Sequence, residues 1–134
     1  MLNYGYAILA SEINKSILVN SLDPYCGFLH FDMEGRTSLT FDLIEPFRQQ
    51  IVDKTAIGLI NRKQVTVDDL DKRNNTIKLE ARKLIVEKIL GKIYSTITYN
   101  DETLSYFDLI GKQSDNLVDV LLKCEKFEGF YLRW

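Results

Sequence analysis

One histidine and two carboxylates lie in the stretch from Gly27 to Arg48, and their types can support chemistry at a metal ion. His30 is the only histidine of the chain, and Asp42 and Glu45 follow it, three residues apart at the head of an apolar segment. One imidazole and two carboxylates can hold a divalent cation, and hydrolysis or transfer at phosphate is the usual chemistry of such a set. These three residues are therefore candidates for a metal site.

Each of the three residues also has a purely structural interpretation. Asp42 and Glu45 lie on one face of a helix and fit a capping box, with Asp42 at the N-cap and Glu45 three residues on. Pro46 is tolerated in that first turn, where N–H groups lack helical partners in any case. His30 can equally be a partly buried histidine that bonds to a backbone carbonyl. Residue types alone leave both interpretations open.

The elements that must position these residues are helical. Apolar residues recur at helical spacing in four segments, which predicts helices at 3–20, 41–61, 80–94 and 102–124. Polar residues 62–76 have room for a single helical turn near 67–70, and the aromatic tail is expected to pack back. We predict an all-α fold, a compact helical domain of four to six helices with short connections, as a single domain over residues 1–134.

The bulk composition fits one domain with a real core, because 46% of the 134 residues are apolar. No run of about 18 apolar residues exists, so no membrane span is expected, and the N-terminus has no evident signal peptide. Cys26 and Cys124 are far apart and neither belongs to a CxxC pair. They indicate the reduced thiols of a cytoplasmic protein.

The net charge of −2 argues against a uniformly basic nucleic-acid binder. The charge is not evenly distributed along the chain, however. Residues 61–92 carry nine basic and five acidic groups, whereas residues 1–60 and 93–134 each carry four basic and seven acidic groups. A basic middle can contact phosphate without the whole domain being basic. The alternative is an ordinary solvated helix face with charges at i, i+4 spacing.

Four segments together resemble the C-terminal helical domain of the CRISPR-associated Cas1 family. They are LNYGYAIL (2–9), LDPYCGFLH (22–30), SLTFDLIEPFR (38–48) and the basic DKRNN–TIKL segment (71–79). Their order and spacing agree with the family over most of the chain, and the likeness fades after Ile93. The resemblance implies a metal-dependent DNA endonuclease and integrase, which inserts new spacers into a CRISPR array in antiviral defence.

The resemblance also implies roles for single residues. His30 and Glu45 match the family's metal ligands, and Asp42 is the neighbouring acidic position, so all three are expected to be catalytic. The implied cofactor is Mg²⁺ or Mn²⁺, and an imidazole ligand shifts the preference toward Mn²⁺. Further positions are expected to contact DNA: Tyr4, Arg48, Lys72 and Arg73. The implied partners are DNA of the CRISPR repeat and of the spacer precursor, a Cas2 dimer and a second copy of the chain, with no membrane.

In the family, an N-terminal β domain and a further glutamate ligand precede the LNYGY motif. This chain begins only 29 residues before His30, so the resemblance implies an N-terminally truncated C-terminal fragment that is inactive alone. Three other interpretations remain, and one of them is a metal hydrolase that acts on an unrelated substrate. The chain can be a catalytically dead DNA-binding remnant of the same protein. It can also be a non-catalytic helical interaction module in which His30, Asp42 and Glu45 are structural.

Overall fold

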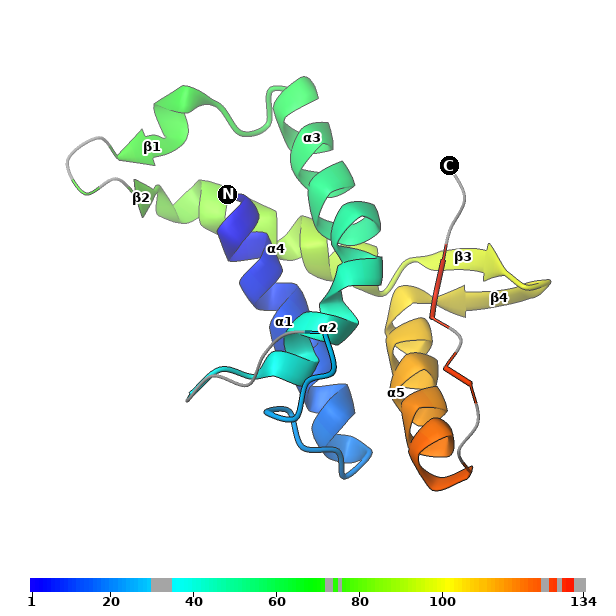
Figure 1. Ribbon diagram of the computed structural model, residues 1–134. Coiled ribbons are helices and arrows are strands. Elements are labelled where there is room, and N and C mark those ends of the chain that lie inside the picture. Colours follow the sequence, from blue (N-terminus) through cyan, green and yellow to red (C-terminus); the bar gives the residue numbers. More distant parts are fainter. Residues whose placement is uncertain (30–34, 72–73, 75, 124–125, 128, 132–134) are drawn as a thin grey trace.

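Five α-helices make up most of the computed structural model, which describes residues 1–29, 35–71, 74, 76–123, 126–127 and 129–131 (Figure 1). The α-helices are α1 (Leu2–Val19), α2 (Ser38–Phe47), α3 (Lys54–Asn61), α4 (Leu79–Ile93) and α5 (Tyr106–Lys123). A π-helix, η1 (Arg48–Asp53), joins α2 to α3, and a 3-10 turn, η2 (Val67–Asp69), follows α3. The predicted helical domain is therefore confirmed.

Two short antiparallel hairpins add to the helices that the sequence predicts. Strands β1 (Leu70–Asp71) and β2 (Thr76–Ile77) pair between α3 and α4, and β3 (Thr96–Tyr99) pairs with β4 (Glu102–Ser105) between α4 and α5. The expectation of helices alone omitted these strands. Neither hairpin contributes a layer to the domain, so the helices carry its architecture (Figure 1).

Helix α1 lies at the centre of the domain, beside α2, α4 and α5 (Figure 1). Its apolar stripe is fully buried, because Leu9, Ile13 and Ile17 have no exposed surface. Burial of each such side chain stabilises the fold by about 1.5–3 kcal/mol. The spacing of four residues between these positions keeps them on one side of the helix. Every other long helix packs on this stripe, so α1 organises the core.

Gly5, in the LNYGY motif, lets α1 approach its neighbours closely. A Cβ atom at this position would lie 2.6 Å from Val52 Cγ1 and 2.8 Å from Ile89 Cδ1. Val52 belongs to η1 and Ile89 to α4, so one bare backbone position receives side chains from two other elements. The glycine is therefore needed here for close helix packing.

The segment from Ser38 to Asn61 is continuous helix but changes geometry in its middle. The prediction placed one helix at 41–61, whereas the helix begins at Ser38 and contains Pro46. Proline has no N–H to donate to the carbonyl four residues earlier, so the regular ladder is interrupted there. The π-helix η1 follows directly, and such segments occur often at functional sites.

Helix α5 begins later than predicted because a hairpin occupies its expected start. The prediction placed a helix at 102–124, but Glu102–Ser105 is strand β4 and the helix starts at Tyr106. Asn100 and Asp101 both have positive φ, of 50° and 63°, as a two-residue type I′ turn requires. At the helix start, hydrogen bonds from Ser105 lower the pKa of Asp108, as in a capping box.

The aromatic tail packs back on the core, as the sequence predicts for the residues that the structure describes. Phe130 is buried and stacks on Phe47, with ring centroids 4.9 Å apart, and meets Tyr99 edge-on at 5.0 Å. Its backbone N–H donates to the Gln113 side chain at 2.8 Å. The tail therefore closes the gap between α2, α5 and the second hairpin.

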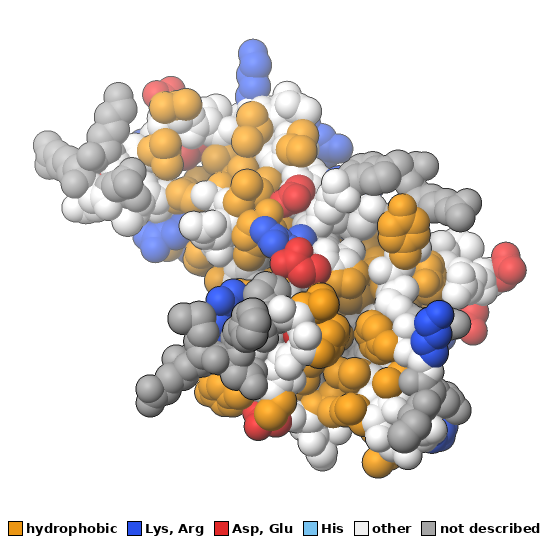
Figure 2. Space-filling view, in the orientation of Figure 1, with side chains coloured by type: hydrophobic (Ala, Val, Ile, Leu, Met, Phe, Trp, Pro, Cys, Tyr) orange, Lys and Arg blue, Asp and Glu red, His pale blue; other side chains and the backbone are white. Residues whose placement is uncertain are grey.

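Hydrophobic side chains gather on the surface where the start of α1, α3 and β1 meet (Figure 2). An apolar hollow of about 290 Å³ lies there, lined in part by Met1, Ile60, Leu70 and Ile77. One side of the first turn of α1 is thus exposed. No helix in the described part of the chain is long and apolar enough to cross a bilayer.

Replacing Gly5 by alanine is expected to destabilise the fold by about 1–2 kcal/mol. Overpacking of a core costs about 1–3 kcal/mol, and the better helix propensity of alanine returns part of that cost. The matched control is Gly111→Ala in α5, where an added Cβ meets no atom within 4 Å. That control should stabilise the helix by about 0.5–1 kcal/mol. Thermal melts compare the two variants, and equal effects of both would contradict close packing at Gly5.

Candidate metal centre

The buried carboxylate of Asp42 holds the chain that leads to His30. Asp42 is 3% exposed, and its Oδ2 accepts hydrogen bonds from the backbone N–H groups of Phe28 at 2.6 Å and Leu29 at 2.9 Å. Bonds to an ionised carboxylate are stronger than bonds between neutral groups. The residue directly before His30 is thereby tied to the second turn of α2.

The capping-box interpretation of Asp42 and Glu45 is wrong. Helix α2 begins at Ser38, with Thr37 at the N-cap, so Asp42 lies inside the helix. The carboxylate of Asp42 instead bonds to backbone N–H groups 13 and 14 residues earlier in the chain. Its assignment as a catalytic residue stays a prediction. The structure adds a positioning role that spacing alone did not indicate.

Three of the predicted site residues lie outside the described part of the chain: His30, Lys72 and Arg73. Their roles as metal ligand and DNA contacts stay predictions. Among the described residues, no group of three or more histidine, cysteine, aspartate or glutamate side chains is placed to hold a metal ion. The described part of the candidate centre therefore consists of Asp42, Glu45 and the segment that ends at Leu29.

Glu45 lies at the surface, one helical turn after Asp42, and pairs with Arg48. Arg48 Nη1 donates to Glu45 Oε1 at 2.7 Å, and the two side chains are 39% and 45% exposed. Hydrogen bonds to Glu45 and then to the Tyr6 hydroxyl raise the pKa of Arg48, so the guanidinium stays charged. The pair is open to solvent and weakly held. A half-exposed carboxylate of this kind can still face an incoming cation.

Tyr6 fixes Arg48 from the other side and connects α1 to η1. The Arg48 guanidinium lies over the Tyr6 ring, 4.5 Å from its centroid, and the Tyr6 hydroxyl donates to Asp53 Oδ1 at 2.5 Å. This hydrogen bond, followed by burial, raises the pKa of Tyr6, so the hydroxyl stays protonated as a donor. A connected series of contacts thus leads from Glu45 of α2 through Arg48 and Tyr6 to Asp53 of η1.

Neither Tyr6 nor Asp53 is among the candidate site residues named in the sequence analysis. The ring of Tyr6 does pack against the core, but its hydroxyl bonds to a residue 47 positions away. The sequence contains one sign that the helix geometry changes after residue 46. Pro46 lies inside the helix, and a proline there interrupts the regular hydrogen-bond pattern. Tyr4 is 39% exposed on α1, and its predicted DNA contact stays a prediction.

Comparison with known proteins identifies the family. The family model described as "CRISPR associated protein Cas1" matches residues 1–90. The chain belongs to the Cas1 family. It is 59% identical over 133 residues to the CRISPR-associated protein Cas1 3 of Methanobrevibacter ruminantium. This match covers 99% of this chain and 40% of that relative. It is 40% identical over 136 residues to the CRISPR-associated endonuclease Cas1 1 of Archaeoglobus fulgidus, over 100% of this chain and 39% of that relative.

Solved structures share the fold. A Cas1 protein from Thermotoga maritima superposes with a TM-score of 0.87 at 24% identity, over 91% of this chain and 39% of that one. A casposase bound to integration product gives 0.83 at 30% identity, over 93% and 37% of the two chains. A chain of a partial Cas6-RT-Cas1–Cas2 complex gives 0.81 at 22% identity, over 99% and 42%. The chain thus spans about two fifths of the length of these Cas1 relatives.

Removing the Asp42 carboxylate is expected to release the segment before His30. Asp42→Ala leaves the N–H groups of Phe28 and Leu29 without their acceptor. The loss of these charge-assisted bonds should lower the free energy of unfolding by about 2–3 kcal/mol. Hydrogen exchange should show faster exchange of these two amides. The matched control, Asp115→Ala on the exposed side of α5, should change stability by only about 0.5 kcal/mol. Unchanged protection of both amides would contradict the positioning role.

Proposed function

We propose that this chain is part of a metal-dependent DNA endonuclease and integrase of CRISPR spacer acquisition, in which His30 and Glu45 are metal ligands. The observation that carries the proposal is the pair of hydrogen bonds from Phe28 and Leu29 to Asp42. They tie the residue before His30 to the helix that presents Glu45 one turn further on. An imidazole and a carboxylate brought from these two segments are donors suited to Mn²⁺ or Mg²⁺.

A divalent ion held by His30 and Glu45 would polarise the scissile phosphate. The other roles belong to side chains of this chain. Arg48, held over Tyr6, is placed to donate to a phosphate oxygen near Glu45. Asp53 orients Tyr6 through its hydroxyl. Asp42 holds the backbone before His30 in place and so acts on the site indirectly, through the position of that segment.

Partners and location follow from the same proposal. One similar structure is a casposase bound to integration product, and another is a complex that contains Cas1 and Cas2. We infer that this chain acts on DNA of the CRISPR repeat and of the spacer precursor, with a Cas2 dimer and a second copy of itself, in the cytoplasm. Three further residues are proposed DNA contacts: Tyr4, Lys72 and Arg73.

Binding of Mn²⁺ tests the metal site directly. Mn²⁺ at ten times its Kd should stabilise the native chain by about 1.4 kcal/mol, which raises the melting temperature by several degrees. The variants Glu45→Gln and His30→Ala should lose this rise. Glu45→Gln alone should change stability little, because its partner Arg48 is a surface residue.

The matched control for this experiment is Glu102→Gln. Glu102 is an exposed carboxylate in β4 that pairs with Lys112 of α5 and not with a residue of the candidate centre. That variant should keep the full response to Mn²⁺. If the native chain shows no response, or if Glu45→Gln responds like the native chain, then these residues have a structural role only.

The 134-residue chain alone is expected to cleave DNA weakly or not at all, even with Mn²⁺. It offers one imidazole and one solvent-facing carboxylate, since the Asp42 carboxylate is taken up by backbone N–H groups. A site with two protein ligands should hold the ion weakly. The assay is incubation with branched and single-stranded DNA and Mn²⁺. Strong cleavage that disappears in His30→Ala would show that Asp42 completes the site.

A further inference from the structure

The described part of the C-terminal tail contacts both segments from which the candidate metal centre is built. Phe127 lies against Phe28, in the segment that leads to His30, and Phe130 lies against Phe47, at the end of α2. The rings of Phe127 and Phe28 have centroids 6.1 Å apart and are tilted by 58°. Two tail residues thus touch the two segments that a metal site must hold together.

Phe130 is the anchor of the tail. Its ring is 4% exposed, lies nearly parallel to the ring of Phe47 and meets Tyr99 of β3 edge-on. Its N–H donates to the side chain of Gln113 in α5, which is itself buried. A buried ring with neighbours on three elements and a bonded backbone donor has little freedom to shift. The core therefore sets the position of the tail.

Phe127 is placed by that anchor but lies nearer the surface. It is half-buried, and its partner Phe28 is 53% exposed. Tilted ring pairs with centroids about 4.5–7 Å apart attract each other beyond the effect of their buried area. Because a largely exposed ring gains little from burial, this contact orients Phe28 more than it stabilises the domain.

The backbone of the same segment is held at one point only. The hydrogen bonds from the N–H groups of Phe28 and Leu29 both end on the single atom Asp42 Oδ2. Bonds that share one acceptor atom restrain the distance of the segment from α2 but leave rotation about that atom less restrained, since the angle at the acceptor is broadly distributed. The ring contact of Phe28 with Phe127 is a second restraint, away from Oδ2.

We propose that Phe127 is a positioning residue of the candidate metal centre, which fixes through Phe28 the direction in which the chain leads to His30. Its effect on metal binding rests on the proposed function, which makes His30 a ligand. Loss of a group that hydrogen-bonds to a ligand typically lowers metal affinity by about 10–100-fold. A ring contact one step further out should have a smaller effect, about two- to tenfold.

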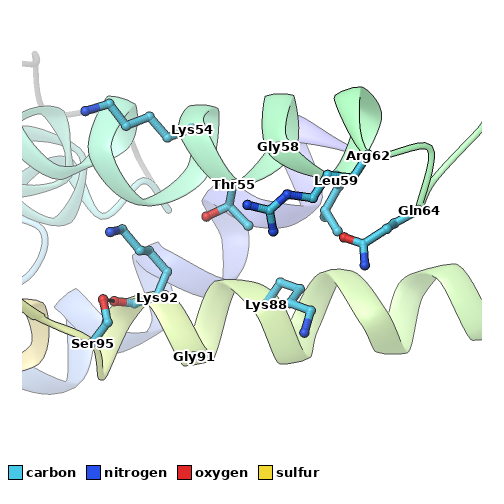
Figure 3. A pocket seen from close by; sticks show the side chains of 10 residues that line it. All are labelled: Lys54, Thr55, Gly58, Leu59, Arg62, Gln64, Lys88, Gly91, Lys92 and Ser95. Atoms are coloured by element: carbon cyan, nitrogen blue, oxygen red, sulfur yellow. Dashed lines mark hydrogen bonds between the residues drawn. The ribbon is translucent and has the colours of Figure 1, made fainter.

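Mn²⁺ is a suitable probe because two polar hollows elsewhere on the described chain offer it no carboxylate. A groove of about 420 Å³ between α3 and α4 is lined in part by four cations, Lys54, Arg62, Lys88 and Lys92 (Figure 3). A second hollow, of about 510 Å³, is lined in part by Lys112 of α5. None of the described residues that line either hollow is acidic. A hard cation prefers charged oxygen ligands, so it is expected to avoid both.

The first measurement is hydrogen exchange at single amides, by NMR on the full 134-residue chain without metal. In Phe127→Ala, the amides of Phe28 and Leu29 should exchange about two- to tenfold faster, because the segment opens more often. The amide of Phe130 should keep its protection, because its bond to Gln113 is unchanged. Phe127→Tyr keeps the ring and should exchange like the native chain.

The matched control is Phe107→Ala. Phe107 is an exposed residue of α5, and its ring forms a similar tilted pair with Tyr94, with centroids 5.4 Å apart. This variant removes the same side chain and the same kind of contact, but from residues outside the tail and the candidate centre. Exchange at Phe28 and Leu29 should stay unchanged in it.

The second measurement is the Kd for Mn²⁺, read from the broadening of the imidazole signals of His30, the only histidine of the chain. Phe127→Ala should have a Kd about two- to tenfold higher than the native chain. Phe127→Tyr and Phe107→Ala should bind Mn²⁺ like the native chain. A side chain with a merely structural role would lower stability without this pattern of loss and rescue.

Several results would overturn the proposal. They are unchanged exchange at Phe28 and Leu29 in Phe127→Ala, an equal change in Phe107→Ala, and faster exchange with an unchanged Kd for Mn²⁺. Loss of protection at Phe130 in Phe127→Ala would also overturn it, because release of the whole tail would then explain the effect. If the native chain binds no Mn²⁺, the proposed function fails, and exchange without metal alone decides whether Phe127 holds the segment.

Discussion

The close contact of α1 with η1 and α4 at Gly5 is the constraint on which the candidate metal centre depends. With no side chain at this position, Val52 and Ile89 fill the space against the backbone of α1. The same approach brings the Tyr6 hydroxyl to Asp53. It also holds η1 and α4 against a common helix. One small residue therefore supports the contacts of Tyr6 with Asp53 and Arg48.

Buried polar groups then fix which way the segments face. A carboxylate as deeply buried as Asp42 is costly unless hydrogen bonds compensate it, and its bonds to the 28–29 backbone do so. Ser16 and Ser114 bond at 2.8 Å between α1 and α5, and Thr40 donates to Asn14 between α2 and α1. Hydrophobic packing alone has no direction, whereas these bonds select one register between the helices.

The helices were predictable because each one buries a stripe at its own repeat of 3.6 residues, and Phe130 of the aromatic tail packs back as expected. The hairpin at 96–105 was missed, although Thr96–Ser105 contains a signal for it. Asn100 and Asp101 readily adopt positive φ, and the flanking residues suit paired strands. The predicted apolar stripe of α5 is present, but the predicted helix began at residue 102, whereas α5 begins at Tyr106.

The sequence by itself determined the helices, the family resemblance and the residue types that can bind metal and phosphate. Only the tertiary structure decided that Asp42 faces the backbone before His30, that Arg48 lies between Glu45 and Tyr6, and that cations of α3 and α4 share one groove. The reason is physical. Helical periodicity depends on neighbours within a few positions, whereas contacts across 47 residues, such as Tyr6 with Asp53, depend on how whole helices pack.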